Sequence, residues 1–326
     1  MRNVVIIWWV YLKDMNKKDA KIIFMGTPEI SSKVLEGLIL DGYNIIAVIA
    51  QPDRPVGRKK ILMPVPTKVV AEKYNIPVYQ PVKIRKEYEF VNDLHPDLIL
   101  TLAYGQIVPQ GLLDIPTFGA INLHGSLLPK YRGAAPIQYA LLNNDKVTGM
   151  TLMRMTKEMD AGEMYAKKEI AIDEEDNSTS LFIKMGDLAL ELAKESLPLF
   201  LEGKLEGIPQ DESQVTFAPS IKPEEEKIDL NKTKEQIFGQ IRALSETPGA
   251  YLYLNELKLK IYKAKIVSDE ILGEVGTIVK ADKGGLYLQT VNGIIALLDL
   301  QKEGKNRMDY KSFINGNQNL VGQLLK

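Results

Sequence analysis

The chain has 326 residues, 45% of them hydrophobic and 25% charged, a balance typical of a folded globular protein and not of a disordered one. Forty-one basic and forty-two acidic side chains leave a formal charge of −1, which excludes a basic field over the whole molecule. The absence of cysteine excludes disulfides, thiolate nucleophiles and cysteine zinc sites, and it favours a cytoplasmic location. The length predicts two domains.

Residues 1–20 are predicted to be an extension that is disordered or lies upstream of the true start. The apolar run 4–12 resembles the core of a signal peptide, but no small-residue cleavage site follows it. The run is far shorter than the ~20 residues that span a bilayer, so we expect no membrane attachment. Met15 is a candidate start for a cytosolic protein.

The first half of the chain alternates short apolar runs with amphipathic segments. A strand over 21–26, a helix over 31–42 that ends at Gly42 and a strand over 44–51 form a βαβ unit. Helices are expected next at 65–75 and 86–95, and strands at 76–81, 96–104 and 119–125. Uninterrupted apolar strands are typical of a sheet buried on both faces. The sequence therefore predicts a Rossmann-like, open and mostly parallel α/β sheet.

The second half divides into three parts. Two strands around the turn "MDAG" and a long helix over 180–203 complete a domain at 21–203. Residues 204–225 are polar, with three prolines, and are interpreted as a linker. Residues 226–326 carry one helix and then short strands with turn signals, which predicts a small antiparallel barrel, possibly of the oligonucleotide-binding (OB) type.

An asparagine and a histidine share one face of the strand expected at 119–125. Alternation points Asn122 and His124 to the same side, and Gly125 leaves room for close approach. Ligands of open α/β sheets bind where such strands end. The pair suits acyl transfer, with His124 taking a proton and the Asn122 amide stabilising an oxyanion. The alternative is a buried histidine with a purely structural role.

Two further charged features lie beside expected strands. Asp160, in the turn before Ala161 and Gly162, would orient the imidazole if it reached His124, although acidic turns are often only turns. The stretch 51–64 is interpreted as a loop whose basic residues, Arg54, Arg58, Lys59 and Lys60, hold phosphates or simply face solvent.

Other residues are less informative. The first strand is followed by a single glycine, Gly26, so neither a dinucleotide fingerprint nor a P-loop is present. His95 precedes a proline at a helix end and is expected to be structural. Lys258, Lys260, Lys263 and Lys265 lie on one expected strand, where they would contact a phosphate backbone or protect a sheet edge.

Together these stretches resemble the formyltransferase family that uses 10-formyltetrahydrofolate, above all the members that act on methionyl-tRNA. The resemblance runs from about Lys21 to the end of the chain. It rests on "FMGTPEIS", "QPDRPVGR", "LAYGQIVP", "GAINLHGSLLPKYRGAAPIQ", "TGMTLMRMTKEMDAGEM" and the C-terminal "ALLDLQKEGK". Residues 1–20 have no counterpart in the family.

The resemblance implies a role for each matching position. Asn122, His124 and Asp160 would form the catalytic trio, with His124 as the base for the methionyl α-amine. Ser126, Leu127, Leu128 and Pro129 would line the folate site. Arg58 and Lys59 would belong to a loop that meets the acceptor end of methionyl-initiator tRNA. The donor would be 10-formyltetrahydrofolate, with no metal, and the protein would act as a cytoplasmic monomer in translation initiation.

Two rivals to this interpretation exist. Another enzyme of the same superfamily, acting on an amino sugar nucleotide or releasing formate by hydrolysis, would share the trio. A non-enzymatic RNA-binding protein would use the barrel alone and would not need His124.

Overall fold

The computed structural model describes residues 16–57 and 60–326. Contacts divide the chain into two units. The first contains the described residues up to Ala134 with 148–170 and 182–218, and the second contains 135–147, 171–181 and 219–326. Most of the extension expected at 1–20 lies outside the described residues. Its last part belongs to the first unit, where the ammonium of Lys17 lies 2.9 Å from the carboxylate of Asp41.

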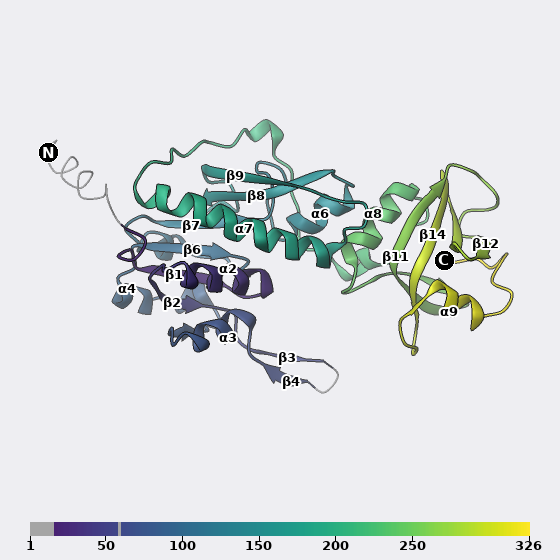
Figure 1. Ribbon diagram of the computed structural model, residues 1–326, viewed down its shortest axis with the longest axis horizontal. Coiled ribbons are helices and arrows are strands. Elements are labelled where there is room, and N and C mark those ends of the chain that lie inside the picture. Colours follow the sequence, from purple (N-terminus) through teal and green to yellow (C-terminus); the bar gives the residue numbers. More distant parts are fainter. Residues whose placement is uncertain (1–15, 58–59) are drawn as a thin grey trace, which may run out of the picture. The chain divides into compact units, whose positions relative to one another are not determined.

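The first unit is built on a seven-stranded sheet in the order β5-β2-β1-β6-β7-β8-β9 (Figure 1). Its strands are β1 (Ile22–Gly26), β2 (Ile45–Ile49), β5 (Val78–Tyr79), β6 (Leu98–Leu102), β7 (Ala120–His124), β8 (Val147–Arg154) and β9 (Met164–Ala171). Pairing is parallel from β5 to β7 and antiparallel between β7 and β8. The predicted, mostly parallel α/β sheet is confirmed.

Helices cover both faces of this sheet. They are α2 (Glu29–Leu40), α3 (Pro66–Lys73), α4 (Phe90–Leu94), α5 (Gln110–Leu113) and α7 (Ser178–Leu201), with the 3-10 turn η1 (Ile84–Lys86). One face packs against Val91 of α4 and Leu112 of α5. On the other face α2 and α7 lie side by side, with Gly37 of α2 facing Leu190 (Figure 1). Every residue of β1 and β6 is buried, as their mostly apolar runs predict.

Close packing at the end of β1 explains its single glycine. A Cβ on Gly26 would lie 2.8 Å from the backbone oxygen of Leu102 on β6. From β1 the chain runs to β2 on one side and later returns to β6 on the other side. Such a reversal opens a crevice at the carboxyl ends of the strands, which is where open α/β proteins bind ligands.

The prediction of a loop at 51–64 was wrong. The segment forms a two-stranded hairpin, β3 (Arg54–Val56) with β4 (Ile61–Met63), in which Arg54 is paired with Met63. A separate two-stranded ladder tolerates proline because its outer N–H groups need no partner. The two basic residues expected to contact tRNA, Arg58 and Lys59, lie outside the described residues.

The stretch expected as a linker is ordered against the first unit as far as Ala218. It contains the 3-10 turn η2 (Glu212–Gln214), and a second turn, η3 (Pro223–Glu226), lies in the second unit. Phe217 makes a parallel bridge to Arg132, and Ile208 makes an antiparallel bridge to Met164.

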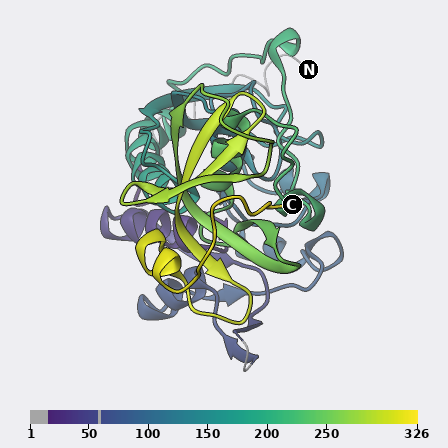
Figure 2. The same ribbon diagram turned by 90° about the vertical axis from the view of Figure 1, so that its right-hand side faces the viewer.

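The second unit contains a six-stranded antiparallel sheet and three helices. The elements are α6 (Pro136–Leu142), α8 (Lys234–Leu244), β10 (Ala250–Leu254), β11 (Leu257–Ser268), β12 (Ile278–Asp282), β13 (Gly285–Thr290), β14 (Gly293–Lys302), β15 (Met308–Asp309) and α9 (Tyr310–Asn315). Burial alternates along β10, and its buried side chains belong to a core that also contains residues of α8 and α9. Figure 2 shows the curved strands in green and yellow.

The end of the chain connects the two edges of this sheet. Lys326 exchanges two backbone hydrogen bonds with Tyr253 next to one edge, and Leu325 donates to Gly276 near the other. An antiparallel sheet is therefore confirmed, while its assignment to the OB type stays a prediction. Among the described helices, none combines the length and the apolar character that crossing a bilayer requires.

Candidate active site

His124 ends β7 at the carboxyl edge of the first sheet, with 5% of its surface exposed. Its Nε2 lies 2.8 Å from the backbone oxygen of Tyr131. A carbonyl oxygen only accepts hydrogen bonds, so Nε2 carries the proton and Nδ1 is the nitrogen left to act as a base. Nδ1 lies 3.6 Å from Oδ2 of Asp160.

Asp160 stands in the connection between β8 and β9, as the turn signal predicts. Its backbone has a positive φ of 52°, which aspartate tolerates better than most residues. Oδ2 accepts a hydrogen bond of 2.8 Å from the backbone N–H of Gly133. A Cβ on Gly162 would lie 2.0 Å from the backbone oxygen of Arg154, so the turn needs glycine at that position. The structure thus brings the expected acid to the expected base.

Asn122 lies two residues before His124 on β7 and is half-buried. Its backbone is paired with Thr101 of β6 and Met153 of β8. Among the described residues its side-chain amide has no hydrogen-bond partner, so the amide is available to a ligand. All three members of the predicted trio therefore belong to the first unit, with Asn122 and His124 on one face of β7.

The loop after His124 is fixed by buried hydrogen bonds. The Ser126 hydroxyl donates to the oxygen of Lys130 at 2.6 Å, and the Thr151 hydroxyl donates to the oxygen of Ser126 at 2.7 Å. Lys167 reaches the oxygen of Leu128, and burial lowers the pKa of this lysine. Ser126 and Leu128 have no exposed surface. Only two of the four expected folate residues, Leu127 and Pro129, keep surface that a ligand could contact.

Sequence reasoning missed a network on the far side of Asp160. Arg132 donates through Nε to Gln210 at 3.0 Å and through both terminal nitrogens to Glu212. Gln210 and Glu212 come from the segment expected to be a linker. Nothing in the sequence pattern around these two residues signals a role. The signal comes from the structure, where the buried Arg132 needs an anionic or carbonyl partner.

A mostly apolar cavity of about 380 Å³ opens at the same edge of the sheet. It is lined where β1, β2 and β6 end, by Thr27, Pro28, Gln51, Pro52, Ala103, Tyr104 and Gly105, and by residues of the hairpin and of the segment after it, Arg54, Met63, Pro64, Val65 and Pro66. The backbone oxygen of Tyr104 accepts hydrogen bonds from Thr27 and Gln51. Burial raises the pKa of the Tyr104 hydroxyl.

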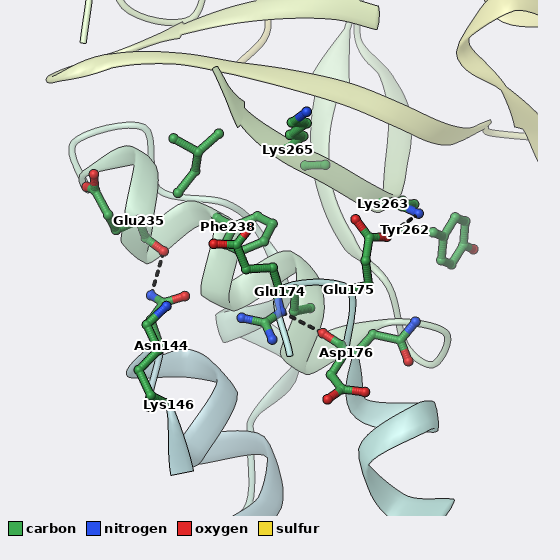
Figure 3. Close-up of a pocket in the computed structure, with 14 residues that line it drawn as sticks. Asn144, Lys146, Glu174, Glu175, Asp176, Glu235, Phe238, Tyr262, Lys263 and Lys265 are labelled. Atoms are coloured by element: carbon green, nitrogen blue, oxygen red, sulfur yellow. Dashed lines mark hydrogen bonds and ion pairs between the residues drawn. The ribbon is translucent and has the colours of Figure 1, made fainter. Parts of the chain in front are cut away.

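A second cavity, of about 420 Å³, is lined by residues of the second unit alone (Figure 3). Arg242 of α8 lies 5.0 Å from the ring of Phe238 and donates to the backbone oxygens of Asp173 and Asp176. Lys263 pairs with Glu175 at 2.6 Å. Four acidic and four basic side chains line this cavity, so their charges largely neutralise each other.

The four lysines expected on one strand all lie on β11. A register shift between Ile261 and Lys263 keeps them on the outward face, because both Leu259 and Ala264 are buried. Lys258 lies 3.9 Å from the ring of Tyr251 on β10. His95 is an exposed residue that ends α4 with a positive φ, in agreement with a structural role.

Comparison with known proteins identifies two family domains. The formyl transferase family matches residues 20–196, and the formyl transferase C-terminal domain matches residues 220–318. A methionyl-tRNA formyltransferase of Lactobacillus acidophilus is 47% identical over 90% of this chain and 95% of its own length. The methionyl-tRNA formyltransferase of Staphylococcus aureus is 47% identical over 94% of this chain and 99% of its own length.

The fold also matches solved structures. An N-formyltransferase of Helicobacter canadensis, solved with folinic acid and dTDP-3-aminofucose, has a TM-score of 0.65 at 20% identity, covering 87% of this chain and 99% of its own. The first family domain contains Asn122, His124 and Asp160, and the relatives at 47% identity match at least 90% of the chain. The chain therefore belongs to the formyl transferase family and is a formyl-transferring enzyme.

Proposed function

We propose that this enzyme transfers the formyl group of 10-formyltetrahydrofolate to the α-amine of methionyl-initiator tRNA. The observation that carries the proposed chemistry is the edge of β7, where Asn122 shares a strand face with His124 and Nδ1 of the imidazole faces Asp160. Among the described residues the Asn122 amide has no hydrogen-bond partner. The choice of acceptor rests on relatives that bear this name and match over nearly their whole length.

Each member of the trio has one task in this mechanism. The amine nitrogen attacks the formyl carbon, and the amide of Asn122 donates to the oxygen as negative charge develops on it. Nδ1 of His124 takes the proton that the amine loses. The carboxylate of Asp160 stabilises the resulting imidazolium. The bond between the formyl carbon and N10 then breaks, N10 receives the proton, and tetrahydrofolate leaves.

The two substrates would use different parts of the edge. The folate donor contacts Leu127 and Pro129, while the buried Ser126 and Leu128 hold the loop in shape. The apolar cavity at the ends of β1, β2 and β6 has the size and lining to receive the methionyl end of the acceptor. Arg58 and Lys59 and the outward lysines of β11 contact the tRNA backbone. The enzyme works as a monomer in the cytoplasm.

The test is a choice of acceptors. Purified protein is given 10-formyltetrahydrofolate with methionyl-initiator tRNA, with methionyl-elongator tRNA or with an amino sugar nucleotide. Formylation of the initiator tRNA, at a kcat/KM well above that of the other two, is expected. Formylation of the sugar alone, or formate release that does not depend on any acceptor, would contradict the proposed acceptor. RNA binding without turnover would contradict the proposed chemistry.

A further inference from the structure

Gln210 makes three hydrogen bonds from a side chain that is 9% exposed. Its amide nitrogen donates to the backbone oxygens of Asp160 at 2.7 Å and Gly162 at 2.8 Å. Its amide oxygen accepts from Nε of Arg132 at 3.0 Å. The reverse amide orientation would set an oxygen against two carbonyls and an NH2 group against a guanidinium, so the network allows one orientation only.

Arg132 fixes the orientation of the Gln210 amide by donating to its oxygen. Its side chain is 6% exposed, and its terminal nitrogens hold the carboxylate of Glu212 at 2.7 and 3.3 Å. The Glu212 carboxylate is 74% exposed, so the ion pair is screened by solvent and contributes little by itself. The buried contact between Arg132 and Gln210 is the one that determines where the amide points.

The turn needs this support because its backbone is strained. Asp160 has a left-handed φ of 52°, a conformation that is less favourable than the right-handed or extended regions for residues other than glycine. The two hydrogen bonds that Gln210 donates reach the backbone oxygens of Asp160 and Gly162, one on each side of Ala161. Without them the two carbonyls lose their partners, and the turn is free to relax away from His124.

The same segment also holds the other partner of His124. The backbone oxygen of Tyr131 accepts the hydrogen bond from His124 Nε2. The backbone N–H of the same residue donates to the Thr216 hydroxyl at 2.9 Å. The backbone N–H of Arg132 donates to the oxygen of Thr216 at 2.9 Å. Residues 210–216 therefore restrain both neighbours of the imidazole, and Gln210 is the member that acts on the carboxylate side.

We infer that Gln210 is a positioning residue for the formyl-transfer reaction: it holds the turn of Asp160 so that the carboxylate faces Nδ1 of His124. The inference rests on the proposed roles of Asp160 and His124. It places a requirement for catalysis in a segment whose sequence is typical of a linker. Gln210 touches neither substrate nor reacting atoms, so its effect passes entirely through Asp160.

The kinetic test uses two substitutions and a matched control. Gln210→Met removes all three hydrogen bonds at similar volume, and Gln210→Glu keeps the acceptor for Arg132 but loses both donors. Gln214→Met is the control, because Gln214 lies on the same segment, is exposed and donates only to Asp211. Both Gln210 variants should lower kcat by about 10- to 100-fold, the scale expected when a reacting group is misplaced by an ångström. KM for the folate should stay within about twofold, and Gln214→Met should behave as wild type.

A double-mutant cycle separates positioning from general damage. In an Asp160→Asn background, Gln210→Met should lower kcat by less than about twofold further, because the carboxylate it positions is already gone. Full multiplicative losses in the double variant would overturn the inference. So would a Gln210→Glu protein with wild-type kcat, or a loss of kcat in Gln214→Met equal to that in Gln210→Met.

A readout without turnover keeps the inference apart from the proposed function. The chain has two histidines, so selective 13C labelling gives two imidazole signals, and the exposed His95 serves as the internal reference. Gln210→Met should shift the His124 signal and leave that of His95 unchanged. An unmoved His124 signal would overturn the inference even in an active enzyme. Failure of the wild type to formylate any charged tRNA would contradict the proposed function alone.

Discussion

One oxygen of Asp160 serves two neighbours: Oδ2 accepts from the backbone N–H of Gly133 at 2.8 Å and faces His124 Nδ1 at 3.6 Å. The second distance is too long for a hydrogen bond. The carboxylate is therefore held by the backbone and not by the imidazole, and it stays in place while the histidine is neutral. A proton arriving on Nδ1 then meets a carboxylate that needs no reorientation.

Asp160→Asn should lower kcat while leaving the fold intact. The amide oxygen can still accept from Gly133, but the negative charge that stabilises the imidazolium is lost. We expect a fall in kcat on the order of 100-fold with little change in the melting temperature. Steady-state kinetics and thermal unfolding of the same preparation measure both. A variant with wild-type kcat would remove Asp160 from the mechanism.

His124→Ala should lower kcat by a factor on the order of 100 or more, because the base that accepts the amine proton is gone. Binding of charged tRNA, measured by filter retention or fluorescence anisotropy, should change little. His95→Ala is the matched control, since this exposed histidine ends α4. Equal losses of kcat in the two variants would point to a general effect on folding.

Asn122→Ala should lower kcat by about 100- to 1000-fold, the usual effect of removing one donor to a developing oxyanion. The amide makes no hydrogen bond to other described residues, so its loss should leave the melting temperature within about a degree of wild type. Asn122→Asp should be at least as damaging, because it places a negative charge beside the oxyanion. Asn92→Ala, at an exposed position on α4, is the control. A raised KM for the folate with unchanged kcat would assign Asn122 to ground-state binding instead.

The sequence predicts most of the first unit because its signals are local. The strands β1 and β6 are mostly apolar runs, and such runs identify strands buried on both faces. The hairpin of β3 and β4 could not be predicted in this way, because each strand has only three residues, one of them a proline in β3, and shows no periodicity. The ordered structure of 204–218 could not be predicted either. It depends on hydrogen bonds between residues far apart in the sequence, such as that from Arg132 to Gln210, 78 positions away.

The candidate site also contains residues that the sequence predicts and one that it does not. Asn122 and His124 are found by alternation along a single strand, and Asp160 by a turn signal together with a family resemblance. Gln210 could not be found, because its partners are backbone oxygens of a distant turn and any residue type supplies those. Patterns in a sequence report the residues that do the chemistry more readily than those that hold them.

Arg58→Ala should raise KM for methionyl-initiator tRNA and leave KM for the folate unchanged. Loss of a phosphate contact weakens binding of the tRNA and not of the folate. Because phosphate contacts contribute most at low salt, the increase in KM for the tRNA should become larger as the salt concentration is lowered. Arg85→Ala removes an exposed arginine elsewhere in the first unit and serves as the control. Equal weakening of both substrates by Arg58→Ala would contradict the separation of tRNA and folate contacts.

Glu235 at the start of α8 should make the second unit sensitive to acid. A hydrogen bond from Asn292 and the neighbouring ammonium of Lys234 lower the pKa of Glu235 from 4.5 to about 2. A pKa lowered by folding contributes stability that is complete above pH 4.5 and is lost as the pH falls toward 2. Glu235→Gln should therefore melt below the wild type at pH 7, and the difference should vanish between pH 4.5 and 2. Asn292→Ala should show the same pH window, because it removes the larger cause. A difference in melting temperature that stays constant from about pH 7 to about pH 2 would contradict this assignment.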